Sequence, residues 1–290
     1  MNLDARLESA LQDALGDDAI GSAPPRLLEA VRYAVFPRGA RVRPRLCLAV
    51  AAACGGKDNT IADATAAAIE LLHCASLVHD DMPAFDGAMI RRGKPSVHAR
   101  FGESLALLAG DALIIRSFQV LAAGAVQSPG RLGNVISVIG NGVGMPAGIV
   151  AGQAWECESK VPRDEYQRAK TGALFAAATM GGAAAAGADP EPWRSLGESI
   201  GQAYQVADDL LDANGDPEVM GKPVGRDVAL DRPSAVRELG QLESAATLRR
   251  LVEQAVASVP PCPGETPLRK LIAQESEQFM RLALSCRAAA

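Results

Sequence analysis

Apolar residues recur at helical spacing along most of the chain. In the first segment, Leu3, Leu7, Leu11 and Leu15 lie four residues apart, which places them on one face of a helix. Later segments repeat this pattern between breaks that contain Gly or Pro, and no convincing strand pattern interrupts them. We predict helices over residues 3–15, 44–54, 60–81, 103–124, 130–141, 146–159, 164–186 and 192–214, another that starts at Pro25, and further helices in the C-terminal third.

Length and composition agree with an all-α protein. The chain has 290 residues, which is long for one domain but enough to bury a sizeable core. Aromatic residues make up only 4%, and Ala, the best helix former, is abundant. A β-rich protein would contain more β-branched and aromatic residues in alternation. Because no linker or low-complexity segment divides the chain, we expect residues 1–290 to form a single helical domain.

Charge and targeting signals narrow the function classes. The net charge of −5 argues against broad nucleic-acid binding, which requires a basic surface. The N-terminal segment is charged and lacks the apolar core of a signal peptide. The longest unbroken apolar run that we find, residues 46–54, is far shorter than the ~20 residues that cross a bilayer. The six cysteines form no CxxC pair, which is typical of reduced thiols. We expect a soluble, cytoplasmic protein without a membrane span.

Two predicted helices end in clustered aspartates, and a basic loop follows each cluster. In the second cluster, Asp208 and Asp212 lie four residues apart and share a helix face, with Asp209 about 100° round the axis. Carboxylates at this spacing repel each other, and a hard cation such as Mg²⁺ offsets the repulsion. The basic loop after this helix covers residues 216–233.

The first cluster closes the helix predicted over residues 60–81. Asp80 and Asp81 lie at its end, and Pro83 forces the chain out of the helix, so Asp86 returns from a short turn. A basic loop over residues 87–100 follows. A solvated helix end would explain either cluster alone. Two such clusters, each followed by cations, favour a magnesium site that is shared with a phosphate-bearing ligand.

Basic residues near both clusters indicate an anionic ligand. Carboxylates alone would repel a phosphate, whereas Mg²⁺ between them, with Arg and Lys on the remaining oxygens, binds it well. The cations concerned are Arg91, Arg92 and Lys94 after the first cluster, Lys222 and Arg226 after the second, Arg41, Arg43 and Arg45 upstream, and Lys170 between them. Diphosphate neutralised in this way is a good leaving group, and an apolar bundle keeps an allylic carbocation from water. We find no GxSxG motif and no plausible Cys/His dyad, so nothing indicates a nucleophilic residue.

Six segments carry a resemblance to a known family. They are DDMPAFD (80–86), RRGKPSVH (91–98), AGQAWE (151–156), AKTGALF (169–175), GQAYQVADDLLD (201–212) and GKPVGRD (221–227). Over nearly its whole length the sequence resembles the trans-isoprenyl diphosphate synthases, a polyprenyl synthetase family, and most of all the geranylgeranyl diphosphate synthases of bacterial carotenoid pathways. DDMPAFD is similar to the bacterial form of the family's first aspartate-rich motif, with two extra residues.

The resemblance implies fold, partners and metal ligands together. The fold is a single-domain antiparallel helical bundle around a deep apolar cavity, usually a homodimer. The substrates are isopentenyl diphosphate and allylic diphosphates, joined head to tail. Three Mg²⁺ ions are implied, two bound by Asp80 and Asp86 and a third by Asp208, with Asp81, Asp209 and Asp212 assisting.

The same resemblance assigns substrate-binding residues. The allylic diphosphate is expected on Arg91, Lys170 and Lys222, the carbocation near Thr171 and Gln205 with Gln153, and isopentenyl diphosphate on Arg43, His73 and Arg92. For His73, a buried histidine with satisfied contacts is the ordinary alternative.

Three positions depart from the family pattern. Ala40 stands where the family usually has a lysine at the isopentenyl diphosphate, and we expect Arg41, Arg43 or Arg45 to supply the missing charge. Arg232 replaces a second expected lysine and keeps its charge, and Glu156 stands where the family often has Asp.

Product length is expected to depend on Ala75, which lies five residues before Asp80. Farnesyl-producing relatives carry an aromatic floor there, whereas Ala leaves the space open. A helical turn of ~5.4 Å is comparable to one isoprene unit, so Leu71 or Leu72 is expected to form a deeper floor. The hypothesis is a C20 product made for carotenoid or photosynthetic pigment synthesis. A C15 product is the alternative.

Three other functions compete with this interpretation. A class I terpene cyclase shares the aspartate-rich magnesium site but needs no second diphosphate site, so Arg43, His73 and Arg92 argue against it. An HD-type phosphohydrolase would explain His73 with His79 and Asp80, yet leaves the second cluster unexplained. Inactive partner subunits of prenyl synthases usually lose aspartates, and this chain keeps all six.

Overall fold

The computed structural model describes residues 2–16, 23–36, 39–57, 59–160, 162–214 and 235–285, and these ranges are almost entirely helical. The long helices are α1 (Leu3–Leu15), α3 (Pro25–Val35), α4 (Val42–Ala53), α5 (Asn59–Asp80), α7 (Glu103–Gly124), α8 (Pro129–Val143), α11 (Ala173–Ala186), α12 (Arg194–Asn214), α15 (Ala235–Ala257) and α16 (Glu265–Ser285). The short ones are α6 (Val97–Phe101), α9 (Ile149–Ala154) and α10 (Arg163–Gln167), the 3₁₀ turns η1 (Trp155–Cys157) and η3 (Glu191–Trp193), and the π-helix η2 (Arg168–Gly172). The predicted all-α class is confirmed.

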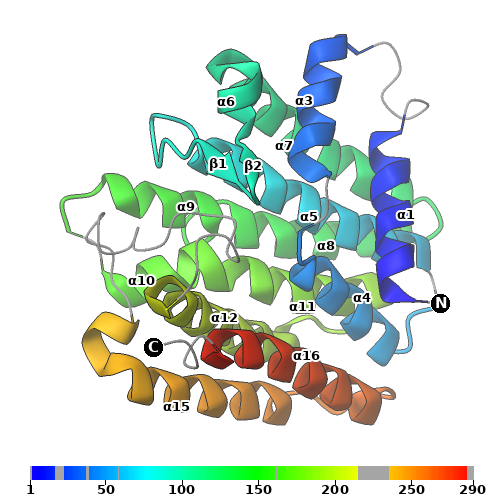
Figure 1. Ribbon diagram of the computed structural model, residues 1–290. Helices are drawn as coiled ribbons and strands as arrows, with labels where there is room; N and C mark the ends of the chain where they lie inside the picture. The colour runs from blue at the N-terminus through cyan, green and yellow to red at the C-terminus, as the bar shows by residue number, and fades with distance from the viewer. Residues whose placement is uncertain are drawn as a thin grey trace.

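Helix α5 lies at the centre of the bundle. It packs against α4, α7 and α11, and α12 packs between α11 and the pair α15 and α16. Figure 1 shows α15 and α16 side by side along the lower edge and the short β1–β2 hairpin beside α3 and α6 at the top. Because α5 has neighbours on several sides, its apolar positions continue around the helix, and 14 of its residues are buried.

Small residues set how closely the central helices approach. A Cβ atom added at Gly124 of α7 would lie 2.2 Å from the Cβ of Ala64 on α5, closer than any side chain allows. The two helices therefore meet almost backbone to backbone at this point. Their packing fixes the direction of α5, whose C-terminal end carries the first aspartate cluster.

Two helices, α5 and α7, are each 22 residues long and apolar enough to cross a membrane by length and composition. A search for unbroken apolar runs, the longest of which is residues 46–54, did not find these two helices because polar residues interrupt both. In the structure the most apolar window of α5 is 78% buried and that of α7 is 33% buried. Both pack within the bundle, and we interpret them as helices of the core rather than as membrane spans.

The loop predicted over residues 87–100 is more ordered than expected. It contains β1 (Ile90–Arg91) and β2 (Lys94–Pro95), which pair antiparallel, and the helix α6. The two residues between the strands, Arg92 and Gly93, both have positive φ angles of 54° and 72°. Such a two-residue turn matches the twist of a hairpin. Strands of two residues have no alternation to detect, so the sequence pattern did not predict them. The basic loop at 216–233 lies outside the described residues.

Candidate active site

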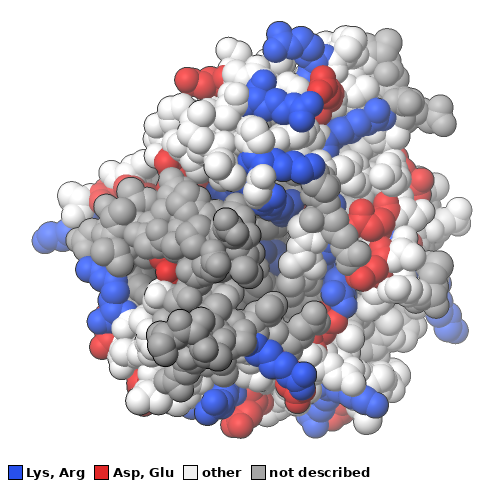
Figure 2. All heavy atoms as spheres, viewed as in Figure 1, with Lys and Arg blue, Asp and Glu red and all other residues white. Residues whose placement is uncertain are grey.

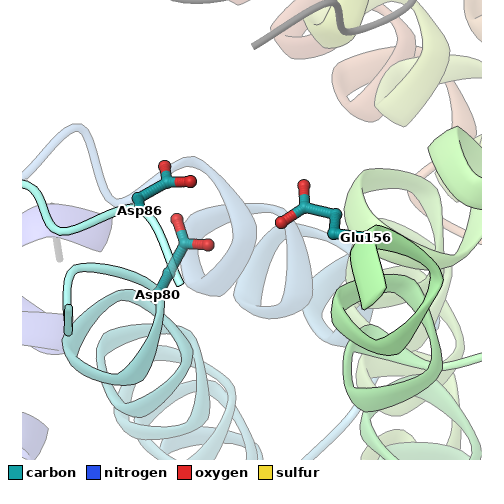
Figure 3. A group of neighbouring side chains, drawn as sticks. All are labelled: Asp80, Asp86 and Glu156. Atoms are coloured by element: carbon teal, nitrogen blue, oxygen red, sulfur yellow. The ribbon is translucent and has the colours of Figure 1, made fainter. Parts of the chain in front are cut away.

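Three carboxylates meet at the C-terminal end of α5. Asp80 is the last residue of α5, and the backbone N–H of Asp86 donates a 2.9 Å hydrogen bond to the Asp80 carbonyl, which closes the turn predicted at Pro83. Glu156 comes from η1 on the opposite wall. One oxygen from each of the three side chains lies within 4.8 Å of the other two, and Figure 3 shows them facing one another across a gap.

This acidic trio, Asp80, Asp86 and Glu156, suits Mg²⁺. The ion prefers hard oxygen ligands and keeps several waters, so it binds to one or two carboxylates that remain open to solvent. All three side chains are partly exposed, as such a site requires. In the sequence Glu156 is only a departure from the family pattern, and its position beside Asp80 and Asp86 was not predicted.

Lys170 lies against the acidic trio. Its Nζ donates to an Oε1 of Glu156 at 2.5 Å and to Oδ1 of Asp80 at 3.3 Å. The residue belongs to the π-helix η2, and Gly152 of α9 touches the backbone of Lys170 so closely that a Cβ there would lie 2.4 Å from its nitrogen. Because η1 directly follows α9, this contact also brings η1 close to η2. As a result Lys170, predicted to bind the diphosphate, lies beside Asp80, predicted to bind the metal.

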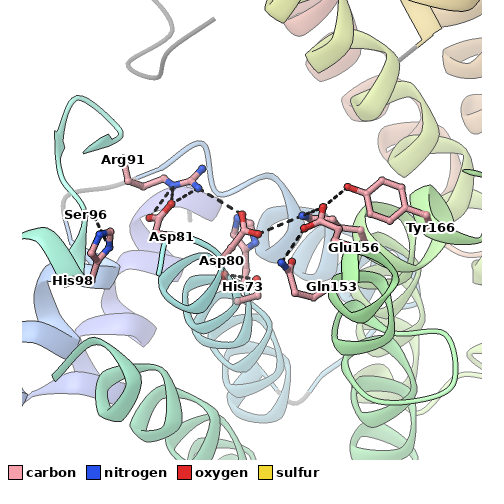
Figure 4. Close-up of polar contacts among 11 residues, drawn as sticks. His73, Asp80, Asp81, Arg91, Ser96, His98, Gln153, Glu156 and Tyr166 are labelled. Carbon is pink, nitrogen blue, oxygen red and sulfur yellow. Dashed lines mark hydrogen bonds and ion pairs between the residues drawn. The ribbon is translucent and has the colours of Figure 1, made fainter. Parts of the chain in front are cut away.

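Glu156 is held by two further side chains. The hydroxyl of Tyr166 donates to Oε1 at 2.5 Å, and the amide Nε2 of Gln153 donates to Oε2 at 3.0 Å. Figure 4 shows this chain of contacts running from Tyr166 through Glu156 to Asp80 and on to Arg91. Nothing in the sequence pattern pointed to Tyr166.

Asp81 and Arg91 form a separate ion pair. Arg91 Nε donates to both oxygens of Asp81 at 3.0 and 3.1 Å, and its Nη2 lies 3.7 Å from Asp80. Burial raises the pKa of the Asp81 carboxyl, and the hydrogen bonds from Arg91 oppose that rise. The structure therefore directs Asp81 toward Arg91 and leaves it out of the acidic trio, while Arg91 remains beside Asp80.

Arg43, Arg92 and His73 interact through their charges, and we call them the basic cluster; His73 lies about two turns before Asp80 on the same face of α5. The Arg43 guanidinium lies 4.2 Å from the ring centroid of Phe175, and its Nε is buried without a hydrogen-bond partner. In the described part of the chain, no carboxylate forms an ion pair with Arg43. Burial lowers the pKa of His73 well below its ordinary value, and the charges of Arg43 and Arg92 lower it further. A partly buried cation without a counter-charge is suited to an anionic ligand.

Arg41 and Arg45 do not belong to this cluster. Arg41 is 2% exposed and donates to Glu70 at 2.6 Å and to Glu8 at 3.2 Å. Arg45 pairs with Asp4 and Glu275. Both guanidinium groups are thus occupied within the protein, which corrects the expectation that either could replace the missing lysine at position 40. Arg43 is the remaining upstream cation.

Ala40 is exposed and lines a pocket of about 370 Å³. The pocket is mostly apolar, and it reaches Tyr204 and Asp208 on α12. A small side chain at position 40 therefore leaves open space beside the second aspartate cluster.

The second aspartate cluster lies on α12, and its three side chains differ in exposure and in contacts. Asp208 and Asp212 are partly exposed, whereas Asp209 is 1% exposed. Asp209 accepts hydrogen bonds from Gln205 Nε2 at 2.9 Å and from the backbone N–H of Ala235 at 2.7 Å, where α15 begins. Asp209 therefore joins α12 to α15, and Asp208 and Asp212 face the solvent-accessible side.

Thr171 and Gln205, both expected near the carbocation, are in contact. The Thr171 hydroxyl donates to Gln205 Oε1 at 2.7 Å, so the two residues and Asp209 form a hydrogen-bonded chain. Ala75, Leu71 and Leu72, expected to set product length, are buried on α5. Lys222, Arg226 and Arg232 lie outside the described residues.

Side chains of both charges therefore surround one opening. The space-filling view shows Lys and Arg side chains in the hollow near the centre of the face that Figure 1 presents (Figure 2). The site combines a carboxylate group that suits a divalent cation with basic side chains that suit phosphate. That combination fits ionisation of a diphosphate ester.

Comparison with known proteins agrees with this chemistry. The geranylgeranyl diphosphate synthase of Rhodobacter capsulatus is 51% identical over 285 residues, covering 98% of this chain and 99% of its own. That of Cereibacter sphaeroides is 48% identical over 287 residues, covering 99% and 100%. The geranyltransferase of Helicobacter pylori, solved in complex with magnesium and isoprenyl diphosphate, superposes with a TM-score of 0.82 at 27% identity, covering 95% and 96%. The polyprenyl synthetase signature matches residues 24–262. The chain belongs to the polyprenyl synthetase family.

Proposed function

We propose that this protein is a geranylgeranyl diphosphate synthase, a prenyltransferase that condenses isopentenyl diphosphate with allylic diphosphates. The observation that carries the proposal is the position of the acidic trio and the basic cluster around the same end of α5. The acidic trio suits a metal-bound diphosphate, and the basic cluster suits a second, metal-free diphosphate. Near 50% identity over almost the full length to two geranylgeranyl diphosphate synthases supports the C20 product.

In this proposal the carboxylates hold magnesium and the cations hold phosphate. Asp80 and Asp86 bind two ions and Asp208, with Asp212, binds a third, while Asp81 and Asp209 assist by positioning Arg91 and Gln205. When bound, Mg²⁺ neutralises the diphosphate and stabilises the charge that develops as it leaves. Arg91, Lys170 and Lys222 contact the leaving diphosphate oxygens.

The remaining polar residues serve the carbocation and the second substrate. The hydrogen-bonded pair of Thr171 and Gln205 presents oxygen atoms toward the developing positive charge. Arg43, His73 and Arg92 hold isopentenyl diphosphate, so that its double bond can attack the allylic carbon. Of Arg41, Arg43 and Arg45, only Arg43 lacks an ion pair within the described residues, which supports its assignment to this anion.

The test is product analysis with purified protein. The protein is incubated with Mg²⁺, labelled isopentenyl diphosphate and a C5, C10 or C15 allylic primer in turn, and the dephosphorylated products are sized. A C20 product from each primer is expected. The variants Asp80→Asn and Asp208→Asn should each lower kcat by at least about a hundredfold, because each removes a proposed metal ligand. Failure of the wild type to elongate any primer would overturn the proposal.

A farnesyl diphosphate synthase is the second candidate. It is favoured by the fold, since an FPP/GFPP synthase from Zymomonas mobilis superposes with a TM-score of 0.78 at 30% identity. Products that stop at C15 in the same assay would establish it. An inactive partner subunit is less well supported because all six aspartates are present.

The proposal extends to assembly and location. We infer a homodimer through α7 and α8, because several large apolar side chains are exposed together on the outer faces of these two helices. The exposed residues are Leu107, Leu108, Ile115, Phe118 and Ile136. Light scattering should give twice the mass of 30.1 kDa, and Ile115→Glu should give the monomer mass. We further propose a cytoplasmic location and a role in carotenoid or photosynthetic pigment synthesis.

A further inference from the structure

Tyr166 is a buried phenol beside the acidic trio, and the reaction as outlined does not use it. The side chain is 8% exposed, and its hydroxyl donates to Oε1 of Glu156 at 2.5 Å. Lys170 donates to the same oxygen at the same distance. A buried hydroxyl that shares its acceptor with a lysine affects how strongly that lysine is held.

The backbone explains why these groups meet. Tyr166 lies in the last turn of the short helix α10, and Lys170 follows four residues later in the π-helix η2; both side chains reach Glu156 of η1. Isolated π-helical turns are frequent at functional sites. Gly152, which has no Cβ, allows α9 to touch the backbone of Lys170. Any side chain at position 152 would push α9 away from Lys170 and so separate Glu156 from Lys170.

Hydrogen bonds fix both oxygens of the Glu156 carboxylate. Oε1 accepts from Tyr166 and Lys170, and Oε2 accepts from Gln153 at 3.0 Å. A carboxylate with three donors cannot rotate without losing at least one of them. Oε1 accepts hydrogen bonds from both the phenol and the ammonium group. Glu156 therefore orients Lys170 but does not pair with it alone, and Lys170 keeps positive charge for a further anion.

We propose that Tyr166 is a positioning residue that acts through Glu156. With Gln153 it fixes the Glu156 carboxylate, and Glu156 in turn holds the Lys170 ammonium 3.3 Å from Asp80, where metal and diphosphate meet. This inference rests on the proposed function for the identity of the diphosphate. We call the set of Gln153, Glu156 and Tyr166 the Glu156 clamp.

The first test measures binding rather than turnover. Tyr166→Phe removes only the hydroxyl, and the binding of inorganic diphosphate with Mg²⁺ to the free enzyme is followed by calorimetry. Loss of a group that orients a ligand in this way typically weakens metal-dependent binding by ~10-fold, and that loss is expected here. KM for the allylic substrate should rise by a similar factor, while KM for isopentenyl diphosphate should change little. The exposed neighbour Glu158→Ala is the matched control and should bind as the wild type does.

The second test asks whether Tyr166 acts through Glu156. In a Glu156→Ala background the hydroxyl has lost its acceptor, so adding Tyr166→Phe should change diphosphate binding by less than about twofold. If the two losses multiply instead, Tyr166 acts by another route and the inference is wrong. Gln153→Met, which removes the donor to the other oxygen, should weaken binding in the same direction, and it serves as the substitute if Tyr166→Phe does not fold.

The outcomes separate this inference from the proposed function. If Tyr166→Phe binds Mg²⁺ and diphosphate as tightly as the wild type, the clamp is wrong even when the enzyme makes C20 product. If the binding losses occur as expected but the wild type elongates no primer, the clamp stands and the proposed reaction fails.

Discussion

The guanidinium of Arg92 occupies the space where a side chain at position 39 would begin. A Cβ atom added at Gly39 would lie 2.6 Å from both Cζ and Nη2 of Arg92. Arg92 itself adopts the left-handed conformation, with φ of 54°, at the turn of the β1–β2 hairpin. Gly39, just before α4, therefore leaves room for the Arg92 guanidinium, which belongs to the basic cluster and lies on the turn of the hairpin.

Gly39→Ala should move Arg92 and weaken binding of isopentenyl diphosphate. A rise in KM of about tenfold is expected, which corresponds to ~1.4 kcal/mol, with a smaller change for the allylic primer. Steady-state kinetics with each substrate varied separately would measure it. The control is Gly130→Ala, because a Cβ at position 130 in the first turn of α8 meets no atom within 4 Å. Equal effects of the two substitutions would show that Arg92 does not depend on Gly39.

Ala40→Lys should strengthen binding of isopentenyl diphosphate. Arg41 and Arg45 are held in internal ion pairs, so the cluster has one cation fewer than the family pattern provides. Because position 40 is exposed, the gain should be modest, a fall in KM of about threefold. Ala40→Met, of similar length without charge, is the control. A KM that falls equally in both variants would attribute the effect to packing in the adjoining pocket rather than to charge.

Ala75→Phe should shorten the product from C20 to C15. Ala75 is 1% exposed on α5, less than two turns before Asp80, so a phenyl ring there is expected to obstruct the path of the growing chain. Product sizing with a C5 primer would test it, and continued formation of C10 and C15 products would show that the variant is folded and active. Wild-type product length in this variant would exclude Ala75 as the length determinant.

His73 should make the protein less stable in mild acid. Its pKa in the folded protein lies well below 6.5, so below pH 6.5 the unfolded chain binds a proton that the folded chain does not. Its contribution to stability is therefore present above pH 6.5 and is lost as the pH falls, by up to ~1.4 kcal/mol per pH unit. Urea unfolding of the wild type and of His73→Gln between pH 5 and 7.5 would measure this. The variant should show a shallower fall, and an unchanged pH dependence would contradict the assignment.

Buried thiols should resist alkylation in the native protein. Burial raises the pKa of Cys54 and of Cys74 to about 12, so only about one thiol in 10,000 is a thiolate at pH 8. Cys157 is exposed. Among the five cysteines that the structure describes, Cys157 should react first with iodoacetamide, and peptide mass spectrometry would identify the order. Rapid labelling of Cys74 would indicate that α5 opens in the native state.

Helical periodicity predicted much of the fold because most helices are long and are separated by breaks that contain Gly or Pro. The bounds of α1 and α7 agree with the sequence to the residue, since Gly or Pro follows or precedes them closely. The β1–β2 hairpin could not be predicted because its strands are too short to show an alternation, and the π-helix η2 could not be predicted because it packs against the separate helices α9 and α12. Arg41 shows the same limit in the site, since only the packing of α4 on α5 brings Glu70 to its guanidinium.

The aspartate motifs were found from the sequence because their spacing is local. Which of the aspartates bind protein groups instead of remaining open to a metal could not be predicted. Asp81 and Asp209 lie beside predicted metal ligands, yet both are buried and hydrogen-bonded to protein groups. Glu156 and Tyr166 belong to the site only because α9 lies beside α5 and α10 packs against α9 and η2. Their roles, like those of the other site residues, remain predictions for the experiments above.

Lys170 contacts Asp80, and Arg91 contacts Asp81. These contacts make the binding of the metal ion and the binding of the diphosphate depend on each other. Each cation is already paired with a carboxylate, so a metal ion alone must compete with an ammonium group, and a diphosphate alone must compete with a carboxylate. When both arrive, Asp80 would be available to the metal while Lys170 and Arg91 would bind the phosphate oxygens. Each ligand should therefore raise the affinity for the other by the same factor, a reciprocal thermodynamic coupling that discourages either from occupying the site alone.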